Sequence, residues 1–145
     1  MKKVIILSFI LCILSTSCFY YLNNLYNTKI KNEFDKGTYY IVEGTYRILK
    51  QSLEKDSINW GKGTKNTKNY QYAFLNINEF KNILKKREID FYYIYLSKIT
   101  VDLEKLYNLK DLIGLDYKDY EQKFKKITER IDKNIKMIEG ALWKK

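Results

Sequence analysis

The side chains that could carry out chemistry in this 145-residue chain are its carboxylates, its tyrosines and two thiols. There is no histidine, so a Ser-His-Asp triad, a Cys-His dyad and an imidazole metal ligand are all excluded, and two cysteines cannot build a four-thiolate zinc site. Glu88 and Asp90 are spaced i,i+2, which directs them to different sides of a helix. Because no nucleophile, base and orienting group can be combined, we expect no enzyme, no cofactor and no metal.

A short glycine-containing run, Gly61-Lys62-Gly63-Thr64, superficially resembles a phosphate-binding loop. The P-loop pattern requires Ser or Thr directly after the lysine, because that hydroxyl binds the magnesium ion. Here Gly63 stands in that position. The run therefore does not indicate a nucleotide site.

The chain is basic, with 27 Lys and Arg against 17 Asp and Glu and a net charge of +10. Such a charge attracts anionic polymers and surfaces without specifying one. The basic residues are scattered, and 24 of them are lysine, in a composition also rich in Asn, Ile and Tyr. All of these have AT-rich codons, so codon bias accounts for much of the charge.

The amino-terminal residues follow the sequence pattern of an export signal. Lys2 and Lys3 precede an apolar run over residues 4–14, and the small polar residues 15–17 lead directly to Cys18. A positive start, an apolar stretch of this length and a small-residue site are typical of a secretory signal peptide. The lysine pair should remain cytoplasmic, which places the rest of the chain outside the membrane.

The run Leu14-Ser15-Thr16-Ser17-Cys18 resembles the signal of bacterial lipoproteins. In that family an aliphatic residue, two small residues and a cysteine form a site that is lipidated on the thiol and cleaved before it. The resemblance covers residues 1–18 and implies a lipid at Cys18 as the first mature residue. This chain departs from the family at Ser15, since the aliphatic Leu14 stands one position early.

Two other hypotheses for the amino-terminal segment also agree with the sequence. Val4 to Leu22 is long enough for an uncleaved membrane helix, since a bilayer needs about 20 apolar residues. Alternatively, Ser15 and Ser17 mark ordinary cleavage that releases the product. Lipidation and the uncleaved helix both predict an extracytoplasmic domain, residues 19–145, anchored to the membrane of the cell envelope. Because export removes the chain from the cytoplasm, no nucleic-acid partner is expected.

The remaining sequence predicts an all-α protein. Apolar residues recur at alternating steps of three and four, the period of one helix face. A first helix is expected from Tyr20 to about Lys55, with a candidate break at Gly37-Thr38, a second from Asn78 to about Tyr107, and a third after an N-cap at Asp116. The stripes are Tyr39, Val42, Tyr46, Leu49 and Leu53, widened by Ile41, Thr45 and Ile48; Ile89, Tyr92, Leu96, Ile99, Leu103 and Leu106; and Tyr117, Tyr120, Phe124, Ile127, Ile131, Asn134 and Ile138.

Two polar residues near these stripes receive a specific expectation. Asn134 should lie at the edge of its stripe, with Ile135 inside. Asp102 and Lys98, spaced i,i+4, should form a pair on a solvated face.

Between the first two helices, Asp56 to Asn76 lacks periodicity and is expected to be a long basic and aromatic loop. We regard it as the candidate partner-contact surface, made by Trp60, Lys62, Lys65, Lys68, Tyr70 and Tyr72. The alternative is that its rings fold back over the core, because exposed aromatic patches are uncommon in monomers.

Amphipathic helices of this kind bury their stripes in an antiparallel bundle of three or four helices with coiled-coil-like crossing angles. We therefore expect a small lipoprotein that serves as a non-catalytic interaction or structural module of the envelope. An anionic envelope component suits its lysine-rich faces, which include Lys81, Lys85, Lys86 and Arg87. The alternative is an envelope-anchored inhibitor or immunity-type protein that binds one partner protein.

Overall fold

The computed structural model describes the backbone of residues 2–62, 65–85 and 91–143, and their side chains apart from residues 2–12, 30, 91 and 92. The chain divides into two units, Met1–Gly37 and Thr38–Lys145. Each unit is described separately below.

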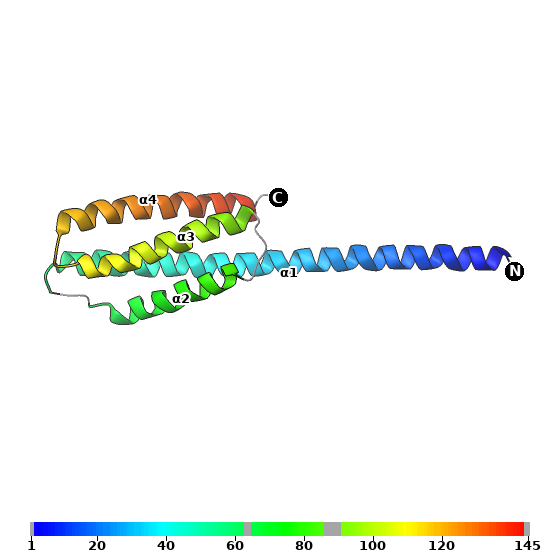
Figure 1. Cartoon of the computed structure of the whole chain (residues 1–145), viewed down its shortest axis with the longest axis horizontal. Helices are drawn as coiled ribbons and strands as arrows, with labels where there is room; N and C mark the ends of the chain where they lie inside the picture. The colour runs from blue at the N-terminus through cyan, green and yellow to red at the C-terminus, as the bar shows by residue number, and fades with distance from the viewer. Residues whose placement is uncertain (1, 63–64, 86–90, 144–145) are drawn as a thin grey trace. The chain divides into compact units, whose positions relative to one another are not determined.

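The second unit is a helical bundle, which confirms the all-α expectation. It contains the carboxyl-terminal part of α1 (Lys2–Ile58), then α2 (Thr67–Lys85), α3 (Phe91–Asn108), the short 3-10 helix η1 (Leu109–Leu112) and α4 (Tyr117–Leu142). In Figure 1 each of the four α-helices of this unit runs opposite to the one before it. The described residues of the bundle contain no strand.

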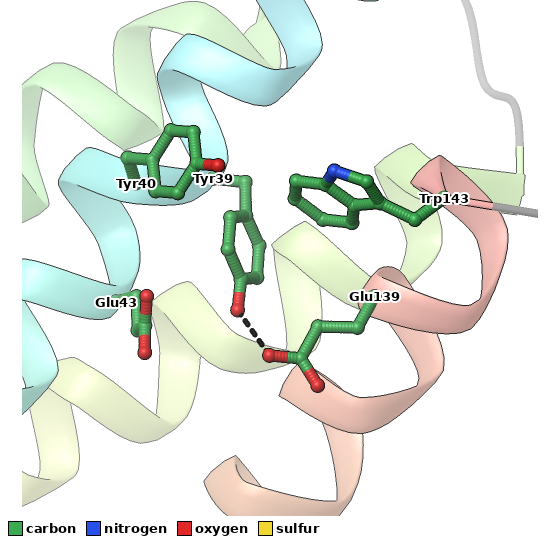
Figure 2. A pocket seen from close by; sticks show the side chains of 5 residues that line it. All are labelled: Tyr39, Tyr40, Glu43, Glu139 and Trp143. Atoms are coloured by element: carbon green, nitrogen blue, oxygen red, sulfur yellow. Dashed lines mark hydrogen bonds between the residues drawn. The ribbon is translucent and has the colours of Figure 1, made fainter.

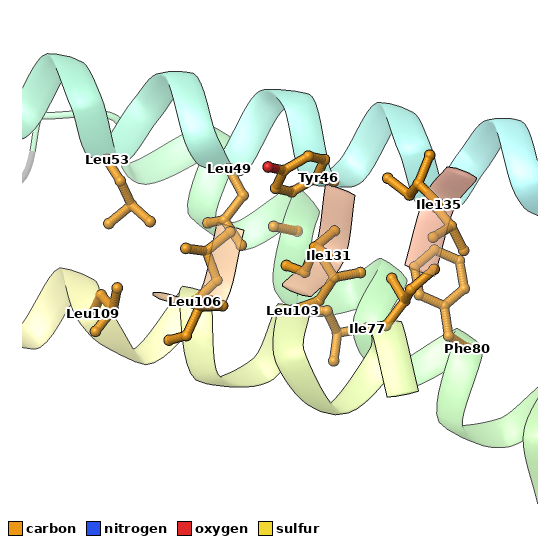
Figure 3. Packing of buried hydrophobic residues seen from close by; sticks show 14 of the residues in the cluster. Tyr46, Leu49, Leu53, Ile77, Phe80, Leu103, Leu106, Leu109, Ile131 and Ile135 are labelled. Atoms are coloured by element: carbon orange, nitrogen blue, oxygen red, sulfur yellow. The ribbon is translucent and has the colours of Figure 1, made fainter. Parts of the chain in front are cut away.

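The core of the bundle is built from the predicted stripes. Side chains from all four helices point toward one another in Figure 3. Fully buried leucine and isoleucine side chains of this kind each contribute about 1.5 to 3 kcal/mol through the apolar surface they remove from water. The buried apolar residues from α1, α3 and α4 include Tyr39, Val42, Tyr46, Leu49, Leu53, Leu96, Ile99, Leu103, Leu106, Tyr120, Ile127, Ile131, Ile135 and Ile138.

A few members of the stripes differ from the expectation. Ile41 and Tyr117 are about half exposed; Ile41 lies beside the main stripe of α1, and Tyr117 is the first residue of α4. Ile135 is buried and Asn134 half-buried, which confirms the edge position of the asparagine. Ile89 and the side chain of Tyr92 lie outside the described residues.

The predicted long loop from Asp56 to Asn76 is wrong at both ends, because α1 continues to Ile58 and most of the second half is helix α2. α2 begins at Thr67, so the connection from α1 spans only residues 59–66. Tyr70, Ala73, Ile77 and Phe80 bury one face of α2 against the core. The single predicted helix from Asn78 to Tyr107 is also wrong, because α2 ends at Lys85 and α3 begins at Phe91.

The turns at one end of the bundle contain an N-cap and two glycines with positive φ angles. The Asp116 carboxylate accepts a hydrogen bond from the Asp119 amide at 3.0 Å, which confirms it as the N-cap of α4. Gly61 and Gly114 adopt positive φ angles of 84° and 91°. A Cβ atom on Gly114 would lie 3.4 Å from the Cα of Gly61, so the two turns pack against each other.

In the first unit, the backbone of α1 is helical from Lys2 and continues through Gly37 and Thr38, so the candidate break is absent. Side chains 13–29 are exposed, Cys18 among them. Within the part of the chain whose side chains are described, no helix is both long enough and apolar enough to span a bilayer. Residues 4–12 of the alternative membrane helix lie outside that part.

Candidate functional site

Positively charged side chains gather on the surface between α3 and α4 of the bundle. Three hollows of about 400, 380 and 460 Å³ follow one another there and all are lined by Arg130. We call this surface the α3–α4 groove. Its charged lining residues are Lys98, Asp102, Lys105, Lys123, Lys126, Arg130 and Lys133, six cations against one carboxylate.

Arg130 and Asp102 form the centre of the α3–α4 groove. Arg130 Nε donates to Asp102 Oδ2 at 3.1 Å, and Nη2 donates to Oδ1 at 2.8 Å. The Asp102 side chain is 9% exposed and the Arg130 side chain 41% exposed, so the carboxylate is buried while part of the arginine faces solvent. A guanidinium carries five N–H groups, and these two bonds use two of them. Asp102 therefore fixes the arginine fork while N–H donors remain for an anion.

The lysines of the groove surround this fork. Lys105 Nζ lies 3.8 Å from Asp102 Oδ1, and Lys123 pairs with Asp119 at 2.7 Å. Lys98 Nζ lies 5.1 Å from the centroid of the Tyr95 ring, a cation–π distance. Lys126 and Lys133 are exposed and form no ion pair within the described part of the chain. The groove thus holds excess positive charge beside a preoriented arginine.

The expected solvated pair of Asp102 with Lys98 is wrong. Asp102 is buried and bonds to Arg130, which lies 28 residues later in the sequence. Spacing within one helix cannot reveal this, because the partner comes from another helix. The available signal was the 4 and 3 spacing of Lys126, Arg130 and Lys133, which places three cations on one face of α4.

The structure does not unite the candidate contact residues of the α1–α2 connection into one surface. Trp60 is half-buried, and its ring makes edge contacts with Tyr117 and Tyr120 at centroid distances of 5.2 and 5.4 Å. Tyr70 is buried, so both of these rings cover the core. Lys62 and Lys65 are exposed. Lys68 and Tyr72 are also exposed, one turn apart on α2.

The lysine-rich stretch that begins at Lys81 is partly described. Lys81 Nζ donates to Glu104 at 2.6 Å, which joins α2 to α3, and Lys85 is exposed. Lys86 and Arg87, together with Glu88 and Asp90, lie outside the described residues.

A buried polar cluster around Asp56 joins the end of α1 to Lys65, Asn66 and the start of α2. Both carboxylate oxygens of Asp56 accept from the Lys65 amide at 3.2 Å. Oδ1 accepts from Asn66 Nδ2 at 2.7 Å, and Oδ2 accepts from the Tyr70 hydroxyl at 2.9 Å. Asn69 Nδ2 donates to Ser52 Oγ at 2.9 Å. These donors and acceptors satisfy one another's hydrogen bonds inside the bundle. We therefore assign the cluster a structural role and not a binding role.

The described residues contain no group of three or more His, Cys, Asp or Glu side chains arranged to hold a metal ion. Comparison with known proteins finds no matching family model, no similar curated protein and no similar solved structure.

Proposed function

We propose that this protein is a membrane-tethered, extracytoplasmic lipoprotein whose bundle binds an anionic component of the bacterial cell envelope through the α3–α4 groove. The observation that carries the proposal is the fork of Arg130 on Asp102 among five lysine side chains. A planar guanidinium recognises phosphate and carboxylate oxygens in pairs, and lysines around it add charge.

The buried Asp102 carboxylate favours specific recognition of an anion over non-specific electrostatic attraction. Holding Arg130 in one geometry before binding removes part of the entropy loss that a free arginine side chain suffers on binding. Surrounding lysines add long-range attraction, which weakens with ionic strength. Tethering raises the local concentration of the groove at the membrane surface, so modest affinity is sufficient. No step of this function requires bond making or breaking, and we propose a non-catalytic role.

The groove is tested by removing two of its lysines. The double variant Lys126→Gln, Lys133→Gln should bind a poly(glycerol phosphate) chain about tenfold more weakly and reduce the salt dependence, d log K/d log[salt], by about 2. Titration of the labelled polymer at several salt concentrations measures both quantities. The matched control is Lys125→Gln, Lys136→Gln, which removes the same charge from exposed positions of α4 outside the groove.

Equal losses in the two double variants would mean that net charge alone attracts the polymer, and the groove would be rejected. Binding of one protein at a fixed ratio, insensitive to salt and lost in the groove variant, would instead favour the inhibitor or immunity-type function. Both outcomes are measured with the same two double variants, the groove variant and its charge-matched control.

The tether is tested at Cys18, which is exposed in the structure. Cells expressing the wild-type chain and Cys18→Ala are grown with a fatty-acid analogue that can be coupled to a dye. We expect label and membrane retention in the wild type and loss of label in the variant, because the thiol is the acceptor that the lipoprotein resemblance implies. Label that persists in Cys18→Ala contradicts lipidation at Cys18, while membrane retention without label in either chain favours the uncleaved amino-terminal helix.

A further inference from the structure

A second hollow, of about 360 Å³, lies between α1 and α4 of the bundle and has the opposite character to the α3–α4 groove. It is lined by Tyr39, Tyr40, Glu43, Glu139 and Trp143. Three aromatic rings and two carboxylates face this space, and among the residues that the structure describes no lysine or arginine lines it. In a chain with a net charge of +10, such a lining is an electrostatic exception. We call this site the aromatic hollow.

The three rings form a corner. Figure 2 shows Tyr39 between Tyr40 and Trp143. The ring centroids of Tyr39 and Tyr40 are 5.5 Å apart, those of Tyr39 and Trp143 are 5.1 Å apart, and those of Tyr40 and Trp143 are 6.0 Å apart. The interplanar angles are 69°, 72° and 68°, so the rings meet edge to face. Tyr40 and Trp143 stay 60% and 43% exposed, which leaves ring surface open to a ligand.

The carboxylates are held in place around these rings. The Tyr39 hydroxyl donates to Glu139 Oε1 at 2.5 Å, across 100 residues of sequence (Figure 2). Burial, together with this hydrogen bond, raises the pKa of Tyr39 well above its usual value, so the hydroxyl keeps its proton and remains a donor to Glu139. The Trp143 amide donates to the Glu139 carbonyl at 3.1 Å, which ties the indole to the same turn. Glu43 pairs with Arg47, which is not part of the lining.

This lining matches one ligand chemistry. The face of an aromatic ring carries partial negative charge and attracts cations, and the attraction is greatest for cations that lose little hydration on binding. A carboxylate beside the rings adds direct charge complementarity. We propose that the aromatic hollow binds a quaternary ammonium group, with Trp143 and Tyr40 as the ring faces and Glu139 as the counter-ion.

The charge of the ligand is tested first, on the full chain with no substitution. Choline is compared with 3,3-dimethylbutan-1-ol, which has the same shape without the charge, by isothermal titration calorimetry. We expect choline to bind about tenfold more tightly, since cation–π contacts at partly exposed rings and the adjacent carboxylate favour only the charged compound. Equal binding of the two compounds, or no saturable binding of either, overturns the proposal.

Two variants then test the residues. Trp143→Leu keeps an apolar side chain but removes the ring, and should weaken choline binding about tenfold. Glu139→Gln keeps an acceptor for the Tyr39 hydroxyl and removes the charge, and should weaken choline binding while leaving the neutral compound unaffected. The controls are Tyr72→Leu, an exposed ring on α2, and Glu121→Gln, an exposed carboxylate on α4. Wild-type affinity in both site variants overturns the assignment; if Trp143→Leu fails to fold, Glu139→Gln decides.

A quaternary ammonium group reaches the protein either as a free small molecule or on a lipid headgroup. Vesicles of phosphatidylcholine that bind the full chain and release it on addition of choline identify the headgroup as the source. Choline binding without vesicle binding identifies the free molecule. Because the aromatic hollow and the α3–α4 groove share no residue, the Lys126→Gln, Lys133→Gln variant should retain choline affinity, and failure of either proposal is visible separately.

Discussion

Replacing Asp56 with alanine is expected to lower the free energy of unfolding by about 3 to 5 kcal/mol, a large fraction of the stability of a domain this size. The carboxylate is 1% exposed and accepts hydrogen bonds from the Lys65 amide, Asn66 and Tyr70. Alanine removes both acceptor oxygens at once, so the Lys65 amide and the Tyr70 hydroxyl lose this partner and Asn66 keeps only its 3.3 Å bond to the Ser52 carbonyl. The loss arises from unsatisfied donors more than from lost attraction.

Urea unfolding of the full chain, followed by far-UV circular dichroism, measures this effect. Glu54→Ala is the matched control, because Glu54 is an exposed carboxylate two positions earlier on α1 and its removal should change stability by no more than about 0.5 kcal/mol. Asp56→Asn keeps one carbonyl acceptor and should fall between the two. Equal stability of Asp56→Ala and Glu54→Ala would show that water replaces the lost acceptor.

Alkaline pH is expected to unfold the bundle cooperatively. Burial raises the pKa of Tyr120 to about 12 and raises the pKa values of Tyr39, Tyr46 and Tyr70 further still. A hydrogen bond to a carboxylate adds to the increase for Tyr39 and Tyr70. In the unfolded chain all four hydroxyls titrate near the ordinary value of about 10.

The sign of the effect follows from proton binding. Above about pH 10 the folded state holds more protons than the unfolded state, so stability that is complete below that pH is lost as the pH rises. Each tyrosine contributes a slope of up to about 1.4 kcal/mol per pH unit, and four such slopes exhaust ordinary domain stability by about pH 12. Circular dichroism at 222 nm and tyrosinate absorbance near 295 nm should change together.

Tyr46→Phe provides the control for this titration. The Tyr46 hydroxyl is buried and has no hydrogen-bond partner among the described residues, so its removal should leave stability at neutral pH unchanged or raise it. With one fewer proton to lose, the alkaline midpoint should move to higher pH. Tyr72→Phe removes an exposed hydroxyl and should leave the midpoint in place. A midpoint that is the same in both variants would contradict the assignment to buried tyrosines.

The sequence predicted those parts of the fold whose pattern is local. The stripe from Tyr39 to Leu53 is buried throughout, because five apolar residues at 3 and 4 spacing fill one side of a helix wherever that helix packs. α2 was missed because its first turns are rich in Lys, Asn and Thr. The spacing of Tyr70, Ala73, Ile77 and Phe80 was the available signal, but the predicted second helix started only at Asn78.

The α3–α4 groove could not be predicted from the sequence for a different reason. Asp102 has the spacing of a surface ion pair with Lys98, and burial is decided only when α4 brings Arg130 beside it. The aromatic hollow likewise joins Tyr39 to Glu139 and Trp143 from the far end of the chain. Helix faces can be read from periodicity, whereas the pairing of one face with another depends on tertiary packing.

The place of α4 in the bundle has a consequence for the order of events during synthesis. Its isoleucines 127, 131, 135 and 138 form one side of the core, and the Tyr120 hydroxyl donates to the Leu53 carbonyl, 67 residues earlier. Contacts over such separations form only after both partners have left the ribosome. If the chain is exported unfolded and amino terminus first, as the proposed signal implies, α4 is the last helix to cross the membrane. The core of the exported protein would then close only after α4 has crossed.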